Sequence, residues 1–159
     1  MKDRHTPNEG AIGTIKYKGK LYYGRLLKAP TLGIYAKAFS APLVPPLLPK
    51  LADFPFAFEV PIHVGVIGKG KFEIVEKVPL LQSDINAMKP RYWQDIGDLS
   101  NCVIVYPDGS ERKATPEECV GLEALGAADY VHILWQIDRD FNGIPNPTLD
   151  YTKVKLPKK

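Results

Sequence analysis

An alternation of apolar and other residues in the middle of the chain constrains its fold more than any other feature. Apolar side chains recur at every second position, at Phe56, Phe58, Val60, Ile62, Val64 and Val66. In an extended strand this spacing places them on one face, which predicts a long strand that is buried on that face. Pro61 cannot donate a ladder hydrogen bond, so we expect the strand to lie at a sheet edge or to carry a bulge there.

Shorter segments on both sides of this strand also have strand character. We predict strands at Gly13–Lys18, Leu21–Lys28, Thr31–Phe39, Lys71–Val78, Cys102–Tyr106 and Glu111–Ala114. Gly19, Gly68–Gly70 and Pro107–Ser110 mark tight turns. Because Tyr22 and Tyr23 are consecutive, one of them should point out of the sheet.

Two connections are expected to lack regular structure. Residues 41–50 contain four prolines, which exclude a regular helix or a central strand and predict a stiff loop whose leucines pack on the core. Residues 82–97 are polar and predict a second loop, so Tyr92 and Trp93 should lie in a loop.

The period changes from two to between three and four near the C-terminus. Thr115, Pro116 and Glu118 form a helix start signal, which predicts a helix over Pro116–Leu125 that stops at Gly126. A second helix is predicted over Ala128–Phe141. Its apolar stripe consists of Tyr130, Ile133, Leu134, Ile137 and Phe141, and its polar face consists of Asp129, His132, Gln136, Arg139 and Asp140.

Strands followed by helices indicate an α+β fold. We expect a curved antiparallel sheet or partly open barrel of about six to seven strands, with two C-terminal helices packed on it. The 159 residues suit a single domain at 12–143, preceded by a flexible segment at 1–11 and followed by an extended basic tail at 144–159.

The composition is that of a globular protein, with 45% hydrophobic and 25% charged residues. No apolar run approaches the roughly 20 residues of a membrane span. Met1–His5 leads into no apolar stretch, so we expect no signal peptide. Two cysteines do not require a disulfide framework, and we expect a cytoplasmic location.

No group of residues carries an evident catalytic or metal-binding pattern. His5, His63 and His132 are not paired with cysteine or carboxylate at ligand spacing. Cys102 and Cys119 are expected to be small buried residues. We therefore expect no enzyme, no cofactor and no metal. A hydrolase whose carboxylates meet only in the fold stays open as an alternative.

Aromatic and charged side chains are the candidates for partner binding, because Tyr, Trp and Arg are frequent interface anchors. The candidates are Tyr22, Tyr23, Arg25, Arg91, Tyr92, Trp93, Asp95, Asp98 and Trp135. The segment Arg91–Asp98 is expected to contribute to the contact. The alternative is that these aromatics only cover the edge of the core.

Three regions resemble the immunity protein 26 family of bacterial polymorphic toxin systems. The first is the hairpin Gly13–Leu27, with its Tyr-Gly-Arg at Tyr23–Arg25. The second is Phe58–Val64, followed by a strand that ends in Val78-Pro79-Leu80. The third is Ala114–Glu123, followed by the helix that closes at Asp140-Phe141. The resemblance covers most of residues 12–142.

This resemblance implies a non-enzymatic antidote that binds one cognate toxin domain in the cytoplasm and blocks its active site or substrate route. The net charge of +3 is mild and suggests a toxin with a neutral or acidic contact surface. An alternative is a small barrel-like nucleic-acid-binding module, although the mild charge makes nucleic acid an unfavoured partner. This alternative would use Lys16, Lys18, Tyr22, Tyr23 and Arg25.

Overall fold

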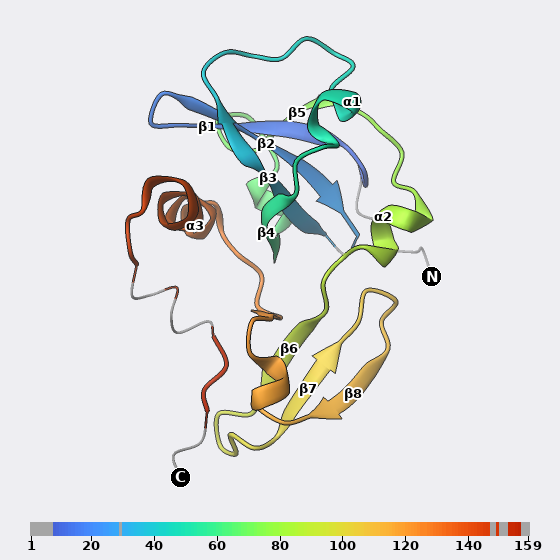
Figure 1. Cartoon of the computed structure of the whole chain (residues 1–159), viewed down its shortest axis with the longest axis vertical. Helices are drawn as coiled ribbons and strands as arrows, with labels where there is room; N and C mark the ends of the chain where they lie inside the picture. The colour runs from blue at the N-terminus through green and yellow to red at the C-terminus, as the bar shows by residue number, and fades with distance from the viewer. Residues whose placement is uncertain (1–7, 29, 147–148, 150–152, 157–159) are drawn as a thin grey trace.

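The computed structural model describes residues 8–28, 30–146, 149 and 153–156, and it is α+β with two sheets (Figure 1). One sheet has five strands in the order β4-β3-β2-β1-β5, and the other has four in the order β8-β7-β6-β9. The five-stranded sheet contains β1 (Ile12–Tyr17), β2 (Lys20–Leu27), β3 (Thr31–Phe39), β4 (Phe56–Pro61) and β5 (Glu73–Glu76). The four-stranded sheet contains β6 (Arg91–Gln94), β7 (Cys102–Val105), β8 (Glu111–Ala114) and β9 (Glu123–Ala124). The helices are α1 (Leu48–Leu51), α2 (Gln82–Asn86) and α3 (Tyr130–Asn142), with 3₁₀ turns at Val64–Val66 and Glu117–Cys119.

The predicted antiparallel arrangement of the first strands is confirmed. Lys18 and Gly19 join β1 to β2 in a two-residue hairpin, and both have positive φ. β4 lies at the edge of its sheet, as Pro61 predicted. The long strand itself is shorter than predicted, because β4 ends at Pro61 and Val64–Val66 forms a 3₁₀ turn. The alternation of apolar residues in the sequence therefore continues to Val66, although the backbone pairing of the strand stops at Pro61.

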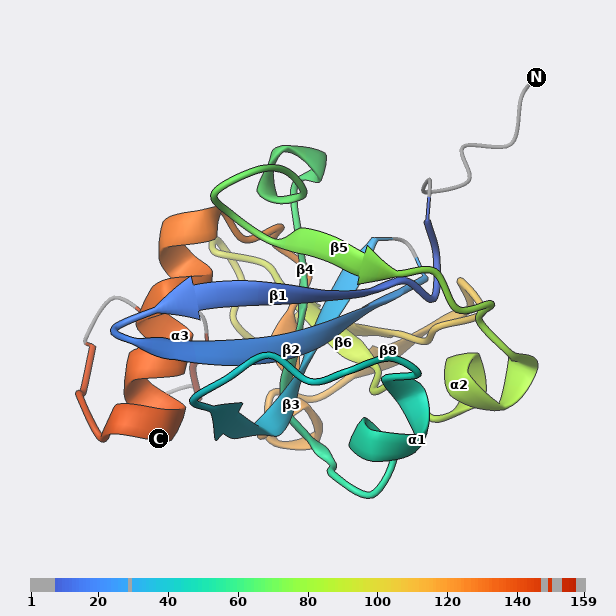
Figure 2. The same cartoon turned by 90° about the horizontal axis from the view of Figure 1, so that it is seen from above.

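Both faces of the five-stranded sheet are covered, so the expectation that Tyr22 or Tyr23 points to solvent is wrong. Tyr22 is buried under α3, where its ring centroid lies 4.9 Å from that of Phe141. Tyr23 is buried on the opposite face and accepts a 2.7 Å hydrogen bond from the Leu43 amide in the proline-rich loop. Figure 2 shows α1 and α3 on different sides of β1–β3.

The proline-rich loop packs leucine on the core, as predicted, but it also contains a helix that was not expected. Leu47 and Leu51 are fully buried against the face that carries Tyr23. The short helix α1 covers Leu48–Leu51. Pro49 stands in its first turn, where the missing amide removes no helical hydrogen bond.

The prediction of two C-terminal helices is wrong, since only α3 forms. The start signal at Thr115 does work locally: its amide donates to Glu118 Oε1 at 3.1 Å, and the Glu118 amide donates to Thr115 Oγ1 at 3.3 Å. Only one 3₁₀ turn follows, because Val120 is already extended, with a ψ of 130°, and Gly121 then adopts a left-handed φ of 87° that turns the chain away. The chain then enters β9 and builds the second sheet.

The predicted polar face of α3 is also partly wrong, because one of its residues is buried against the second sheet. Gln136 was placed on that face, yet it is buried and its amide approaches Glu123 Oε1 of β9 at 3.4 Å. α3 therefore contacts both the five-stranded sheet and the end of β9. The single sheet or barrel of six to seven strands is replaced by two smaller sheets.

Arg25 is a structural residue in the core rather than a surface group. It donates to the carbonyl oxygens of Gly10 and Pro79 at 3.1 and 3.0 Å, and its Nη1 lies 3.1 Å from Asp84 Oδ1 in α2. Gly10 and Ala11 are buried, and the Gly10 amide donates to Leu26 O at 2.7 Å. Gly10 and Ala11 of the predicted flexible segment are thus packed, Asn8 is exposed, and residues 1–7 lie outside the described residues.

Gly10 offers a sharp test of this packing. It has a φ of 91°, and a Cβ there would lie 2.0 Å from the carbonyl oxygen of Val78. We expect Gly10→Ala to lower the free energy of unfolding by about 3 kcal/mol, from backbone strain and overpacking together. Gly109 has a similar φ of 88° with open space around it, so Gly109→Ala is the matched control and should cost about 1–2 kcal/mol. If urea unfolding showed that both variants lose the same free energy of unfolding, the close contact at Gly10 would be contradicted.

Asp138 joins α3 to the first hairpin and predicts a pH dependence. It accepts hydrogen bonds from Tyr17 Oη at 2.6 Å and from Lys18 Nζ at 2.8 Å. The bond from Lys18, followed by that from Tyr17, lowers the pKa of Asp138 below its ordinary 3.8. The stabilisation is therefore fully present above pH 3.8 and is lost as the pH falls through the lower pKa of the folded state.

We accordingly expect Asp138→Asn to lower the urea midpoint at neutral pH, with the difference from the wild type shrinking as the pH falls below 3.8. Asp53 is exposed and makes no ion pair or side-chain hydrogen bond within the described part of the chain, so Asp53→Asn serves as the control. If the difference in urea midpoint between Asp138→Asn and the wild type stayed constant with pH, the stabilising role of the ionised Asp138 would be contradicted.

Candidate partner-binding groove

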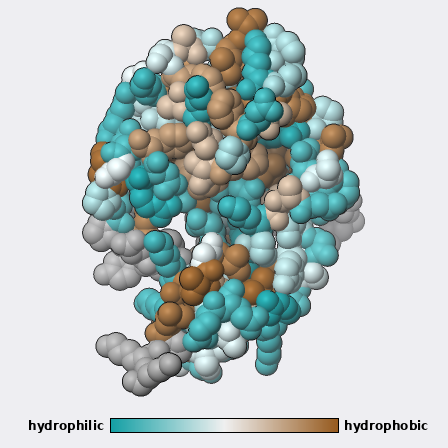
Figure 3. Space-filling view, in the orientation of Figure 1, coloured by the Kyte–Doolittle hydropathy of each residue, from teal (hydrophilic) through white to brown (hydrophobic). Residues whose placement is uncertain are grey.

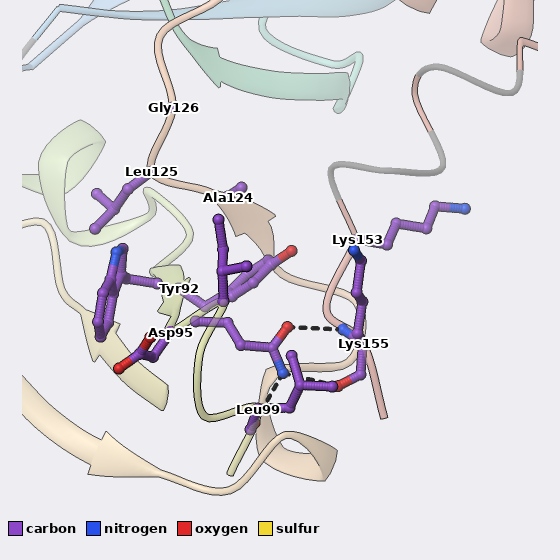
Figure 4. A pocket seen from close by; sticks show the side chains of 11 residues that line it. Tyr92, Asp95, Leu99, Ala124, Leu125, Gly126, Lys153 and Lys155 are labelled. Carbon is purple, nitrogen blue, oxygen red and sulfur yellow. Dashed lines mark hydrogen bonds between the residues drawn. The ribbon is translucent and has the colours of Figure 1, made fainter. Parts of the chain in front are cut away.

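An open groove of about 440 Å³ lies beside the four-stranded sheet (Figure 4). We call it the β6 groove, because three consecutive residues of β6 line it. Its other walls come from the loop after β6, from the chain after β9, and from the C-terminal segment 153–156. The lining residues are Tyr92, Trp93, Gln94, Asp95, Ile96, Leu99, Ala124, Leu125, Gly126, Lys153 and Lys155.

Three large apolar side chains of this groove are open to solvent. Trp93 is 46% exposed, Ile96 is 93% exposed and Leu125 is 41% exposed. We call them the apolar trio. On the face shown in Figure 3, hydrophobic surface gathers over the four-stranded sheet. Apolar side chains grouped around a concavity are typical of a surface that another molecule covers.

The segment 91–98 is partly a strand rather than the predicted loop. Arg91–Gln94 forms β6, which pairs antiparallel with β7. The turn that follows is organised by its own carboxylates. Asp95 accepts bonds from the Gly97 amide at 2.8 Å and from Asn101 Nδ2 at 3.4 Å, and Asp98 accepts from the Ser100 amide at 3.1 Å. These bonds hold the turn in the shape that leaves Ile96 in solvent.

The C-terminal segment forms the opposite wall through Gln94. The Gln94 side-chain amide donates to Lys155 O at 2.7 Å, and the Lys155 amide donates to Gln94 Oε1 at 2.9 Å. Val154 packs against the apolar cluster that contains Tyr92 and Cys102. Residues 153–156 of the predicted tail thus bring Lys153 and Lys155 to the groove, while residues 147–148, 150–152 and 157–159 lie outside the described residues.

The structure brings three of the predicted partner-binding residues to the groove: Tyr92, Trp93 and Asp95. Trp93 is open to a partner, whereas Tyr92 is buried as the groove floor, and this burial raises its pKa to about 12. Asp98 lies in the adjoining turn, where it is exposed.

The other five predicted residues lie elsewhere. Tyr22, Tyr23 and Arg25 are buried in the five-stranded sheet, out of reach of a partner at the surface. Arg91 is buried where the two sheets meet and donates to Thr31 Oγ1 at 3.1 Å; desolvation lowers its pKa. Trp135 is half-buried on α3, with its ring 5.1 Å from that of His132, and it does not line the groove.

Sequence reasoning did not name Leu125 or the two lysines as site residues, and it included Ile96 only as a member of the segment Arg91–Asp98. Ile96 carried a signal, since it is an apolar residue inside the polar turn between Asp95 and Gly97. Leu125 was assigned to a helix that does not form, and no local pattern places Lys153 or Lys155 near β6.

Within the described ranges, no three His, Cys, Asp or Glu side chains are grouped so that they could hold a metal ion. Cys102 and Cys119 are buried, and burial raises the pKa of Cys119 to about 11. A thiol with that pKa is almost entirely protonated at neutral pH, which makes it a poor nucleophile. No described helix is long and apolar enough to cross a membrane.

Comparisons with known proteins assign no family. No protein-family model, curated protein or solved structure matches this chain.

Proposed function

We propose that this chain is an immunity protein, which binds a bacterial toxin domain in the β6 groove and blocks the toxin's active site or substrate route. The observation that carries the proposal is the apolar trio, which is exposed together around an open groove. That the partner is a bacterial toxin domain is inferred from the resemblance of the sequence motifs to the immunity protein 26 family.

The energetics favour protein binding at this place. Trp93 and Leu125 are each nearly half exposed and Ile96 is almost fully exposed, so a partner can bury much additional apolar area. Full burial of a large apolar side chain contributes roughly 1.5–3 kcal/mol. Trp93 is anchored in β6, whose pairing with β7 limits the ordering that binding requires.

The charges around the groove suit an acidic or neutral contact surface. Lys153 and Lys155 line one wall. The carboxylate of Asp95 accepts two hydrogen bonds from its own turn, and that of Asp98 accepts bonds from Ser100. Those bonds fix the two carboxylates in their own turn, whereas Lys153 and Lys155 place positive charge on the opposite wall, where it would attract an acidic segment of a partner and speed its association.

The nucleic-acid alternative receives less support. Tyr22 and Tyr23, which would have to stack on bases, are buried, and so is Arg25. Lys18 pairs with Asp138 at 2.8 Å. Lys16 stays exposed, but the neighbouring Tyr17 is half-buried and its hydroxyl is bonded to Asp138 at 2.6 Å. If nucleic acid were the partner, binding would weaken steeply as the salt concentration rises, which a mainly apolar protein contact would not do.

Co-expression with candidate polymorphic toxin domains, followed by a pull-down, tests the proposal. We expect the wild type to protect the cells and to co-purify with the toxin. Ile96→Asp should abolish both, because it places a charge in the contact that desolvates Ile96. Val44 is 71% exposed in the proline-rich loop, so Val44→Asp is the matched control and should protect fully. Full protection by a folded Ile96→Asp variant would contradict the proposal.

A further inference from the structure

The β6 groove follows the edge of a strand rather than the face of a sheet. Successive side chains of a strand point to opposite faces. Tyr92, Trp93 and Gln94 are consecutive, yet all three line the groove. A cavity can meet all three only where it runs along the strand's edge. β7 covers one edge of β6, so the groove lies along the other.

β9 covers only the first half of that second edge. Its pairs with β6 are Arg91↔Glu123 and Tyr92↔Ala124, and the Leu125 amide adds a bond to Tyr92 O at 3.0 Å. The chain then leaves toward the five-stranded sheet, where the Ala128 amide donates to Pro61 O at 2.7 Å. The second half of the β6 edge is left without a neighbouring strand.

Backbone groups of Gln94 face this uncovered edge. The Tyr92 carbonyl points to β9, and the Asp95 amide points the opposite way, donating to Asn101 O at 3.0 Å. Because alternate residues of a strand direct their amides and carbonyls to the same side, those of Gln94 point into the groove. In the described part of the chain, neither the Gln94 amide nor its carbonyl makes a hydrogen bond.

The far wall does not extend the sheet itself. Lys155 is bonded to the Gln94 side chain through two hydrogen bonds, rather than to the Gln94 backbone through a ladder (Figure 4). The groove between β6 and this segment therefore has a backbone edge on one side, lysines on the other, and Trp93 and Leu125 at its mouth.

We infer that the partner adds an extended, acidic segment to β6 in this groove, pairing its backbone with Gln94. This inference rests on the proposed function and specifies how the partner binds. The added segment places one apolar side chain between Trp93 and Leu125 and carboxylates toward Lys153 and Lys155. Backbone pairing supplies affinity in such strand addition, and alternate side chains supply specificity. The uncovered strand edge is the feature that invites it.

Titration of the ¹⁵N-labelled full chain with a blocked seven-residue peptide tests the inference. The peptide reads Thr-Thr-Glu-Leu-Glu-Thr-Thr, in which the single leucine fixes the register and the two glutamates point to the opposite face, toward the lysines. Two further peptides carry a backbone N-methyl group, one on the leucine and the other on the following glutamate. Neighbouring amides of a strand point to opposite sides, so only one methyl group can block pairing with Gln94.

We expect one N-methylated peptide to bind at least 10-fold more weakly than the parent, and the other to bind within threefold of it. Hydrogen exchange at the Gln94 amide should slow at least 10-fold on binding, while the Asp95 amide, already bonded to Asn101, should change less. Lys155→Glu should weaken binding several-fold, and Lys69→Glu in the distant turn before β5 should leave it unchanged.

Equal binding of both N-methylated peptides, or no binding at millimolar peptide, would overturn the strand addition. So would unchanged exchange at Gln94 in a complex that perturbs Trp93 and Leu125. Any of these results could coexist with toxin protection that depends on Ile96, in which case the proposed function stands and only its binding mode fails. Full protection by the folded Ile96→Asp variant in the co-expression test would instead contradict the proposed function itself.

Discussion

Replacing Trp93 with alanine should weaken toxin binding about 30-fold or more while leaving the protein folded. Tryptophan is the most frequent interface anchor, and truncating a central one costs about 2 kcal/mol or more, which corresponds to this factor. Trp93 projects from a paired strand into the groove with nearly half of its surface exposed, so its loss removes contact area without opening the core. Calorimetric titration of the toxin domain gives the dissociation constant, and urea unfolding verifies the fold.

Trp135→Ala is the matched control for this variant. Trp135 is the other tryptophan of the chain, and it lies on α3 away from the groove residues. Its truncation should change the dissociation constant by less than threefold. Equal effects of the two substitutions on affinity would contradict the assignment of binding to the β6 groove.

Arg25→Ala should destabilise the protein by about 3 kcal/mol without altering the groove. Removing the buried partner of an ion pair leaves the other charge uncompensated and the acceptors of its hydrogen bonds unsatisfied. The Arg25 side chain is 5% exposed and that of Asp84 is 26% exposed. Loss of Arg25 leaves Asp84 without its cation and the carbonyl oxygens of Gly10 and Pro79 without this donor. The urea midpoint reports the loss, and the affinity of the folded fraction for the toxin should equal that of the wild type.

Arg112 provides the contrast, because its ion pair with Glu118 is exposed on both sides. Solvent screens such a pair, so Arg112→Ala should shift the urea midpoint far less than Arg25→Ala. If Arg25→Ala unfolded like the wild type but lost toxin binding, Arg25 would be a contact residue and its structural assignment would be wrong.

Local patterns predicted the five-stranded sheet well, because its first three strands are joined by short turns and need only neighbouring residues to pair. They did not predict two sheets. β6 has four residues and β9 has two, and β9 becomes a strand only by lying parallel to β6, about thirty positions earlier in the chain. Pairing at that distance leaves no period in the sequence.

Exposure was harder to predict than strand position. The residues of β2 from Leu21 to Leu27 are all buried, because α3 covers one face of the sheet and the proline-rich loop covers the other. The local sequence around Tyr22, Tyr23 and Arg25 does not say which distant segments will cover it. For the same reason the groove was predicted only in part: Trp93 and Asp95 lie in one local segment, whereas Leu125 and Lys155 reach it through tertiary contacts.

Hydrogen exchange of the chain with and without the toxin domain, read by mass spectrometry, tests most directly whether the β6 groove is the binding surface. We predict that the complex protects peptides covering residues 92–99 and 123–126, and that the hairpin at residues 16–20 exchanges as in the free chain. Protection of the hairpin with no change at residues 92–99 would contradict the account.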